Sequence, residues 1–287
     1  NVANASSEAE LRGALGWMIG EEGRGVPTII EMVAMTRFDC MIGSSSGMRQ
    51  AAAQALHHCH YRSAFGARLS EQPLMQNVLA DLALENEAAM SYTMRVARAL
   101  DAGNDEQEQR FLRLATPVGK YWICKRTPNH AYEAMECIGG SGVMEDCIMP
   151  RLFRESPVNA IWEGSGNVQC LDTLRALQKS PESLDAFLAE VNQARGSDRR
   201  FDGFVDRLAK DFSGAMGNPE QVSFQARDLV DRLAVSLQAS LLIRNAPAAV
   251  ADAYCASRID SQGIHNIGAL PNGVDAKAIV DRATPHV

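Results

Sequence analysis

The sequence has few of the features that place a chain in a class at first sight. Aromatic residues make up only 6% of it, and no apolar run is long enough to span a bilayer. The net charge is −7, so the chain as a whole lacks the positive surface typical of nucleic-acid-binding proteins. Strand signals are also poor, apart from possible short strands before residue 20. Membrane-spanning, strongly basic and all-β classes are therefore disfavoured.

The seven cysteines are scattered, and no two of them form a Cys-x-x-Cys pair. Such an odd, dispersed set favours reduced thiols over a disulfide framework, so we expect a cytoplasmic protein. The run His57-His58-Cys59-His60 suggests a metal site, because His57 and His60 share a helical face. Metal sites usually gather ligands from more than one element, and the sequence has no second cluster of this kind. A polar helix surface is the favoured interpretation, and no metal is expected.

The sequence does contain strong helical periodicity. Apolar residues make up 46% of the chain and charged residues 22%, as in ordinary globular proteins. Apolar positions recur at helical spacing over residues 29–56, 72–100, 106–138 and 167–178. Pro128 is expected to kink or interrupt the third of these segments. Further amphipathic stretches follow a boundary at residues 179–182, namely residues 184–191, 201–216 and 220–246. The fold class is therefore mainly α, an antiparallel helix bundle followed by a helical extension.

Glu163 is the most informative single residue. It lies in Ala160-Ile161-Trp162-Glu163-Gly164-Ser165-Gly166-Asn167, a lone carboxylate between apolar residues and a flexible turn. Apolar neighbours disfavour the ionised form of a carboxyl group, which suits a general base. Glycines on its carboxyl side allow the backbone to approach a ligand closely. The alternative interpretation is an ordinary turn residue.

Two other segments also have both a structural and a functional interpretation. Gly139-Gly140-Ser141-Gly142 follows a helix rather than a strand, so it is not a dinucleotide-binding fingerprint. It can cap that helix or approach a ligand. Arg62 precedes a glycine turn near a helix end. Its guanidinium can be solvated at the negative helix terminus or can bind an anion such as a pyrophosphate.

The extension contains arginines that raise the question of DNA binding. Arg195, Arg199 and Arg200 lie close together in the sequence, yet residues 181–287 carry 11 basic against 14 acidic residues. A helical surface can still concentrate positive charge locally, but the overall electrostatics give DNA binding no support.

Four segments, in this order, resemble motifs of the acyl-CoA dehydrogenase family, specifically its carboxyl-terminal half. They are Gly20-Glu21-Glu22-Gly23-Arg24-Gly25, Tyr61-Arg62-Ser63-Ala64-Phe65-Gly66, Glu136-Cys137-Ile138-Gly139-Gly140-Ser141-Gly142 and Ile161-Trp162-Glu163-Gly164-Ser165-Gly166-Asn167-Val168-Gln169. The resemblance is closest to the AidB-like branch, which is related to isovaleryl-CoA dehydrogenase and tied to the response to DNA alkylation. Residues 35–40, 123–126 and 161–167 and the extension after Pro181 carry the likeness to that branch.

The resemblance implies a domain organisation. Residues 1–26 would be the end of a middle β-domain, with a possible short β remnant at the start. Residues 27–180 would form the family's antiparallel four-helix bundle, and residues 181–287 a helical extension. The family's amino-terminal helical domain and most of its β-domain are absent, so a missing amino-terminal segment or another chain is expected to complete the site. The family's habit is a homotetramer built as a dimer of dimers.

The resemblance also implies a mechanism with FAD as cofactor. Glu163 would be the catalytic base that removes the α-proton of an acyl-CoA thioester while the β-hydrogen leaves as hydride to the flavin. The implied cofactor contacts are Arg62, Phe65, Gln72, Glu136, Gly139, Gly140, Ser165 and Asn167. The implied substrate pocket consists of Asp39, Trp162, Gly164 and Arg175.

The sequence departs from the family pattern at three positions. Ile42 stands where the family's Asp-x-x-Arg, here beginning at Asp39, has its arginine, and this change bears on acyl-CoA recognition. Glu136 replaces a glutamine, and Trp162 replaces a tyrosine and would narrow the pocket. The alternative function is therefore a DNA-associated alkylation-response protein that retains FAD with little dehydrogenase turnover.

Overall fold

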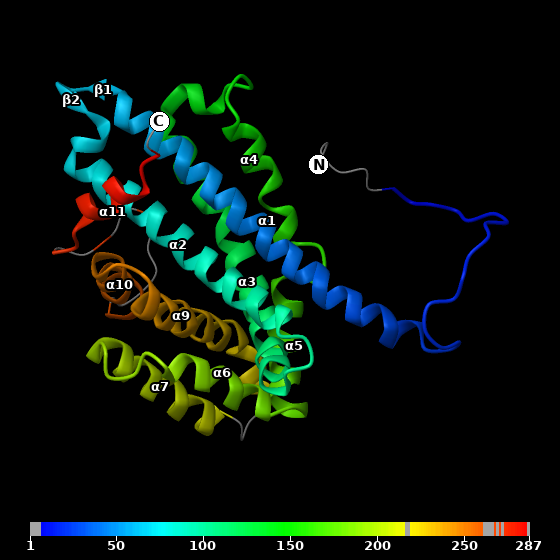
Figure 1. Cartoon of the computed structure of the whole chain (residues 1–287). Coiled ribbons are helices and arrows are strands. Elements are labelled where there is room, and N and C mark those ends of the chain that lie inside the picture. The colour runs from blue at the N-terminus through cyan, green and yellow to red at the C-terminus, as the bar shows by residue number, and fades with distance from the viewer. Residues whose placement is uncertain (1–6, 216–218, 261–266, 268–269, 271–272, 286–287) are drawn as a thin grey trace.

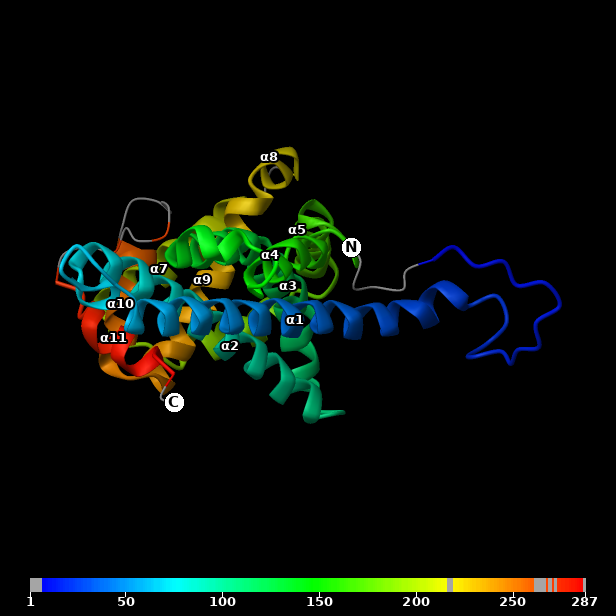
Figure 2. The ribbon, with the colours of Figure 1, turned by 90° about the horizontal axis from the view of Figure 1, so that it is seen from above.

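The computed structural model is an all-helical body from which one long helix and an extended segment project (Figures 1 and 2). It describes residues 7–215, 219–260, 267, 270 and 273–285. Helix α1 spans Gly25–Tyr61, and its amino-terminal turns protrude from the rest of the molecule (Figure 2). A hairpin of two-residue strands, β1 (Ser63–Ala64) and β2 (Ala67–Arg68), and a short 3-10 helix, η1 (Leu69–Glu71), turn the chain back.

Helices α2 (Pro73–Asp101) and α3 (Glu106–Ile138) follow the hairpin and pack against α1 and each other. Each begins at a recognisable signal. Proline opens α2, and Asp105 caps α3 by accepting a hydrogen bond of 2.9 Å from the Glu108 backbone amide. Helix α3 ends at Gly139, whose φ of 73° suits glycine. The sequence-based boundaries of these two helices are confirmed to within one residue.

The expected interruption at Pro128 is wrong, whereas a kink there stays a prediction. Helix α3 runs without a break through both Pro117 and Pro128. The reason is tertiary packing, because α3 contacts α1, α2, α5, α6 and α9. Neighbours on so many sides hold the helix together even though each proline removes one backbone hydrogen bond.

Short elements lead from α3 to the next bundle helix. They are the 3-10 helix η2 (Gly139–Val143), α4 (Met149–Glu155) and the 3-10 helix η3 (Val158–Ala160). Helix α5 (Gly166–Lys179) then returns along α3, and the loop between η3 and α5 carries Glu163.

The extension is helical, as the sequence predicts. It consists of α6 (Glu182–Asn192), α7 (Arg199–Ala215), α8 (Pro219–Phe224), α9 (Ala226–Asn245), α10 (Ala248–Tyr254), a π-helical turn η4 (Cys255–Asp260) and α11 (Ala276–Ala283). The stretch predicted over residues 220–246 is two helices rather than one, since the chain turns at Gln225 between α8 and α9.

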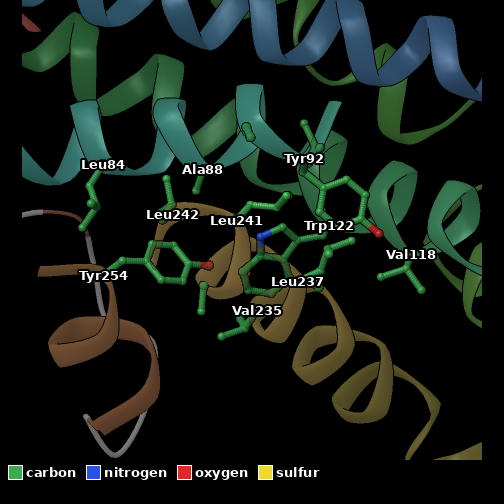
Figure 3. Packing of buried hydrophobic residues seen from close by; sticks show 14 of the residues in the cluster. Leu84, Ala88, Tyr92, Val118, Trp122, Val235, Leu237, Leu241, Leu242 and Tyr254 are labelled. Atoms are coloured by element: carbon green, nitrogen blue, oxygen red, sulfur yellow. The ribbon is translucent and has the colours of Figure 1, made fainter. Parts of the chain in front are cut away.

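The extension shares one hydrophobic core with the bundle. Leu237 and Leu241 of α9 lie beside Tyr92 of α2 and Trp122 of α3 (Figure 3). Two buried donors meet a single acceptor there, because Trp122 Nε1 and Tyr254 Oη lie 2.9 and 2.7 Å from Gln238 Oε1. These two hydrogen bonds join the bundle to the extension inside the core.

A buried charge network fastens the extension to the bundle. Arg126 of α3 donates to both oxygens of Glu85 on α2, and Arg258 of η4 donates to Glu85 and to Asp81. Glu85, Asp81 and Arg258 are all at least nine-tenths buried. Burial raises the pKa of Glu85, but the charges and hydrogen bonds of Arg126 and Arg258 outweigh this effect and lower it to about 2.

Residues 7–24 form no strand, so a β remnant is not seen in the described part of this segment. A strand requires a partner, and nothing described pairs with these residues. Five large apolar side chains in the segment are more than 70% exposed, namely Leu11, Leu15, Trp17, Met18 and Ile19.

Among the described helices, none combines the length and the apolarity that crossing a membrane requires.

Acid should weaken the fold through Glu85. Its pKa is depressed in the folded state, so the stabilisation is complete above the unfolded value near 4.5 and is lost as the pH falls toward about 2. We expect the free energy of unfolding, measured by urea titration, to drop across this window by on the order of 3 kcal/mol from this group. The Glu85→Gln variant should be less stable at neutral pH but should show a flatter acid dependence. An unchanged dependence in that variant would contradict the assignment.

Gly119 should tolerate no side chain. A Cβ at this position of α3 would lie 2.4 Å from Tyr92 Cε1 and 2.6 Å from Met41 Cε. Gly119→Ala should therefore destabilise the protein by about 1–3 kcal/mol through overpacking. Gly47→Ala is the matched control, since a Cβ there meets nothing within 4 Å and helix propensity should stabilise it by up to about 1 kcal/mol. Thermal unfolding of the two variants tests this: the melting temperature should fall for Gly119→Ala and should not fall for Gly47→Ala.

Candidate functional site

The Glu163 loop has an unusual backbone. Glu163 has a φ of 57°, in the left-handed region that residues with a Cβ seldom adopt, and Gly164 follows with a φ of 96°. A Cβ on Gly164 would lie 2.6 Å from the side-chain nitrogen of Gln169, so glycine is required there. The Glu163 side chain is half-buried between the start of α1 and the start of α5. Backbone strain at such a position often accompanies function.

A threonine on α1 holds the carboxylate. Thr36 Oγ1 lies 2.7 Å from Glu163 Oε2 and also 3.1 Å from the carbonyl oxygen of Val33. A hydroxyl has one hydrogen, so Thr36 donates to only one of these acceptors at a time. Donation to Glu163 Oε2, the shorter of the two contacts, holds one oxygen of the carboxylate.

The backbone of the loop is fixed by three side chains from three helices. Lys120 Nζ of α3 donates to the carbonyl oxygens of Trp162 and Gly164 over 2.8 and 2.7 Å. Gln169 Nε2 of α5 donates to the carbonyl oxygens of Glu163 and Gly164 over 3.0 and 2.9 Å. Arg37 Nε of α1 donates to the Glu163 carbonyl over 3.1 Å. Every carbonyl from 162 to 164 therefore has a donor.

Arg37 is itself held by an acidic group on α5. Its Nη1 lies 2.7 Å from Asp172 Oδ2, and Arg113 of α3 lies 3.0 Å from the other carboxylate oxygen. Burial raises the pKa of Asp172, but the hydrogen bonds and charges of Arg113 and Arg37 outweigh it and hold the pKa below its usual value. Asp172 therefore remains charged and orients Arg37 toward the loop.

Six of the eight residues expected to contact FAD lie at the other end of α1. Arg62 is exposed at the end of that helix, Phe65 is 99% exposed at the tip of the hairpin, and Gln72 donates to the Ala64 carbonyl over 2.9 Å. Glu136 is exposed on the last turn of α3.

Gly139 and Gly140 follow in η2, and a Cβ on either would meet nothing within 4 Å. The carboxyl-terminal ends of α1 and α3 are adjacent, because Cys59 Sγ contacts the Cys137 carbonyl oxygen at 3.6 Å. The structure thus brings these six residues to one open end of the bundle.

Ser165 and Asn167 lie beside Glu163, at the start of α5. Ser165 occupies the cap position, yet its hydroxyl makes no capping hydrogen bond and is exposed. Asn167 Oδ1 accepts a hydrogen bond of 3.0 Å from Arg227 of α9, so the extension reaches this loop. These two residues are therefore separated from the Arg62 end.

The residues expected in the substrate pocket are spread around the Glu163 loop. Asp39 and Ile42 are exposed on α1 after Thr36, and Trp162 is 39% exposed with its indole nitrogen 3.1 Å from Asn159 Oδ1. Gly164 is part of the loop itself. Arg175 is exposed on α5, one turn beyond Asp172.

The histidine run of α1 is a surface feature. The rings of His57 and His60 lie 4.9 and 4.8 Å from the ring of Tyr61. Across the described ranges, no three His, Cys, Asp or Glu side chains gather as a metal site requires.

Sequence reasoning missed the groups that support Glu163, namely Thr36, Arg37, Arg113, Lys120, Gln169 and Asp172. Lys120 had a signal, because it is a lysine inside the apolar run from Val118 to Ile123. Such a residue is either buried with partners or marks an exposed edge. Thr36, Arg37 and Gln169 lie in the segments that carry the family resemblance, but nothing local indicates what they bind. Arg113 and Asp172 had no signal, since their contacts join helices more than 50 residues apart in the sequence.

Comparison with known proteins identifies the family of the chain. The model of the carboxyl-terminal domain of acyl-CoA dehydrogenases matches residues 23–178. The "Putative acyl-CoA dehydrogenase AidB" of Escherichia coli is 40% identical over 263 residues, 92% of this chain and 48% of the relative. Acyl-CoA dehydrogenase family member 11 of Caenorhabditis elegans is 33% identical over 78% of this chain and 37% of the relative.

A solved structure supports the same relationship. Caenorhabditis elegans ACDH-11 in complex with C11-CoA superposes with a TM-score of 0.77 at 30% identity, over 84% of this chain and 45% of that one. The chain therefore spans about half the length of the relatives it matches. Since the family model covers more than half of the chain, the chain belongs to the acyl-CoA dehydrogenase family.

Proposed function

We propose that the protein is an FAD-dependent oxidoreductase of the acyl-CoA dehydrogenase type, with Glu163 as the base that removes the α-proton of an acyl-CoA thioester. The observation that carries the proposal is the support of Glu163. Its carboxylate is half-buried, its backbone is fixed at three consecutive carbonyls, and Thr36 lies within hydrogen-bond reach of one carboxylate oxygen. A base held this firmly needs little reorganisation during proton transfer.

FAD is the cofactor of this family, as the sequence predicts. The chain's own residues fit such a group, because Ser165 leaves its hydroxyl free at the start of α5 and the surface over Gly139 and Gly140 is open. Arg62 offers a guanidinium to the pyrophosphate. When bound, the flavin supplies the acceptor for the β-hydride.

One FAD molecule cannot contact both groups of cofactor residues in one chain. Thr36, beside the Glu163 loop, and Arg62 lie on the same helix 26 residues apart, which corresponds to about 39 Å along α1. This span exceeds the length of an extended FAD molecule. The family resemblance implies that Ser165 and Asn167 contact the FAD of their own subunit while Arg62 contacts that of a neighbouring subunit, and this separation supports that division. A homo-oligomer is therefore part of the proposal, with a tetramer as the family's habit.

Further polypeptide is expected to complete the site. The relatives are about twice as long as this chain, and apolar side chains of residues 11–19 and of the start of α1 are exposed, including Trp17 and Ile30. Such surfaces are typical of contacts with other protein segments. The family's amino-terminal domains would supply this contact.

Acyl-CoA is the proposed substrate class, and its recognition should differ from the family pattern. Ile42 is 41% exposed on the α1 surface near Asp39 and brings no charge to that surface. Arg175 on α5 is the group proposed to face the cavity instead.

The DNA-associated alternative remains a prediction. Two of the three extension arginines that raised the question of DNA binding are paired with carboxylates. Arg195 pairs with Asp206, and Arg200 pairs with Asp198 and Asp252. Paired guanidinium groups offer less charge to phosphates, so the flavin-dependent function is better supported.

Acyl-CoA thioesters of several chain lengths should reduce the flavin of the complete protein. We expect loss of the oxidised flavin absorbance under anaerobic conditions with at least one thioester. Glu163→Gln should slow this reduction by at least about 100-fold, because the amide cannot accept the proton, while FAD content stays unchanged. No bleaching by any thioester would rule out the dehydrogenase function.

Thr36 should support the rate of flavin reduction. Thr36→Val removes the hydrogen bond to the Glu163 carboxylate, so flavin reduction by a thioester should slow by roughly tenfold. Thr36→Ser keeps the hydroxyl and should retain the parental rate. Equal rates for the valine and serine variants would contradict a role of the hydroxyl.

A further inference from the structure

Lys120 is an ammonium group in the centre of the fold. It lies on α3 with only 1% of its surface exposed. Burial lowers its pKa, and the positive charge of Arg37 adds to this effect, while nearby thiols and Glu163 act in the opposite direction. Lysine is rarely buried so completely unless its ammonium has partners that compensate for lost hydration.

The partners of Lys120 are two backbone carbonyls rather than a carboxylate. Its Nζ donates to the carbonyl oxygens of Trp162 and Gly164, the residues on either side of Glu163. Both bonds, at 2.8 and 2.7 Å, are short charge-assisted hydrogen bonds. Lys120 thus bridges the turn across the residue with a φ of 57°.

That bridge opposes the tendency of the loop to relax. A left-handed residue with a Cβ is disfavoured by roughly 1–2 kcal/mol, so the conformation persists only where surrounding contacts impose it. Gln169 and Arg37 fix the Glu163 carbonyl, but Lys120 alone joins the carbonyl before Glu163 to the carbonyl after it. The direction in which the Glu163 side chain points depends on the orientation of the two peptide planes that flank it.

We infer that Lys120 is a positioning residue: by binding the carbonyls of Trp162 and Gly164, it holds Glu163 in the left-handed conformation that aims the base at the substrate. The inference rests on the proposed function of Glu163 and assigns Lys120 no contact with substrate or cofactor. This role explains why the charged side chain of Lys120 is buried on α3.

The test compares three variants of the complete, FAD-loaded protein. Lys120→Met removes the charge and both hydrogen bonds at similar length, and Lys120→Gln keeps an amide donor for one carbonyl. Lys179→Met is the matched control, because Lys179 is exposed at the end of α5.

We expect Lys120→Met to lower kcat for flavin reduction by about 100-fold with KM and FAD content nearly unchanged, because misplacing a catalytic group by about 1 Å has an effect of this size. Lys120→Gln should recover part of the loss, and Lys179→Met should match the parent.

A second readout does not depend on turnover. Amide hydrogen exchange of residues 161–166 should speed up at least tenfold in Lys120→Met, while exchange in the core of α2 stays as in the parent. If the parent reduces no flavin, the dehydrogenase function fails, yet this exchange still tests the anchoring of the loop. Parental exchange and parental kcat in Lys120→Met would overturn the inference. If the Met variant does not fold, Lys120→Gln decides by the same two readouts, and parental values there overturn the inference as well.

Discussion

The burial of α3 on nearly every side is the constraint on which the rest of the structure depends. One part of this helix packs against α1 and α5, and another against α6 and α9. Polar side chains on α3 therefore bind groups on the neighbouring elements. Lys120 reaches the Glu163 loop, Trp122 reaches Gln238 of the extension, and Arg126 reaches Glu85. Because each of these groups is removed from water, each must find a partner, and the partners tie the bundle, the site and the extension together.

The site follows from this arrangement. A loop with a left-handed residue would relax if it stood alone, but donors from α1, α3 and α5 fix its carbonyls. The second carboxylate oxygen of Glu163 and the exposed hydroxyl of Ser165 accept or donate no hydrogen bond among the described contacts of the loop. The extension contributes as well, since Arg227 of α9 binds Asn167. The extension thus directly contacts the start of α5, next to the loop that carries Glu163.

Much of the fold could be predicted from the sequence, and the limits have physical causes. Helix periodicity, the break at residues 101–105 and the glycines after Ile138 gave the boundaries of α2 and α3, because these signals act locally. The interruption expected at Pro128 is wrong, because the local cost of proline is overridden by packing that only the folded chain provides. Glu163 was found through its motif, whereas Lys120, Arg37 and Asp172 were not, since they meet the loop from distant parts of the sequence.

The sequence by itself determined the helical class, the family and the identity of the proposed base, because these reside in local patterns and in ordered motifs. The tertiary structure alone decided how that base is held. Which carbonyls Lys120 binds, which arginines Asp172 orients and how far Arg62 lies from Glu163 are consequences of how helices pack. Packing brings together residues that are remote along the chain and places them at distances that no local pattern encodes.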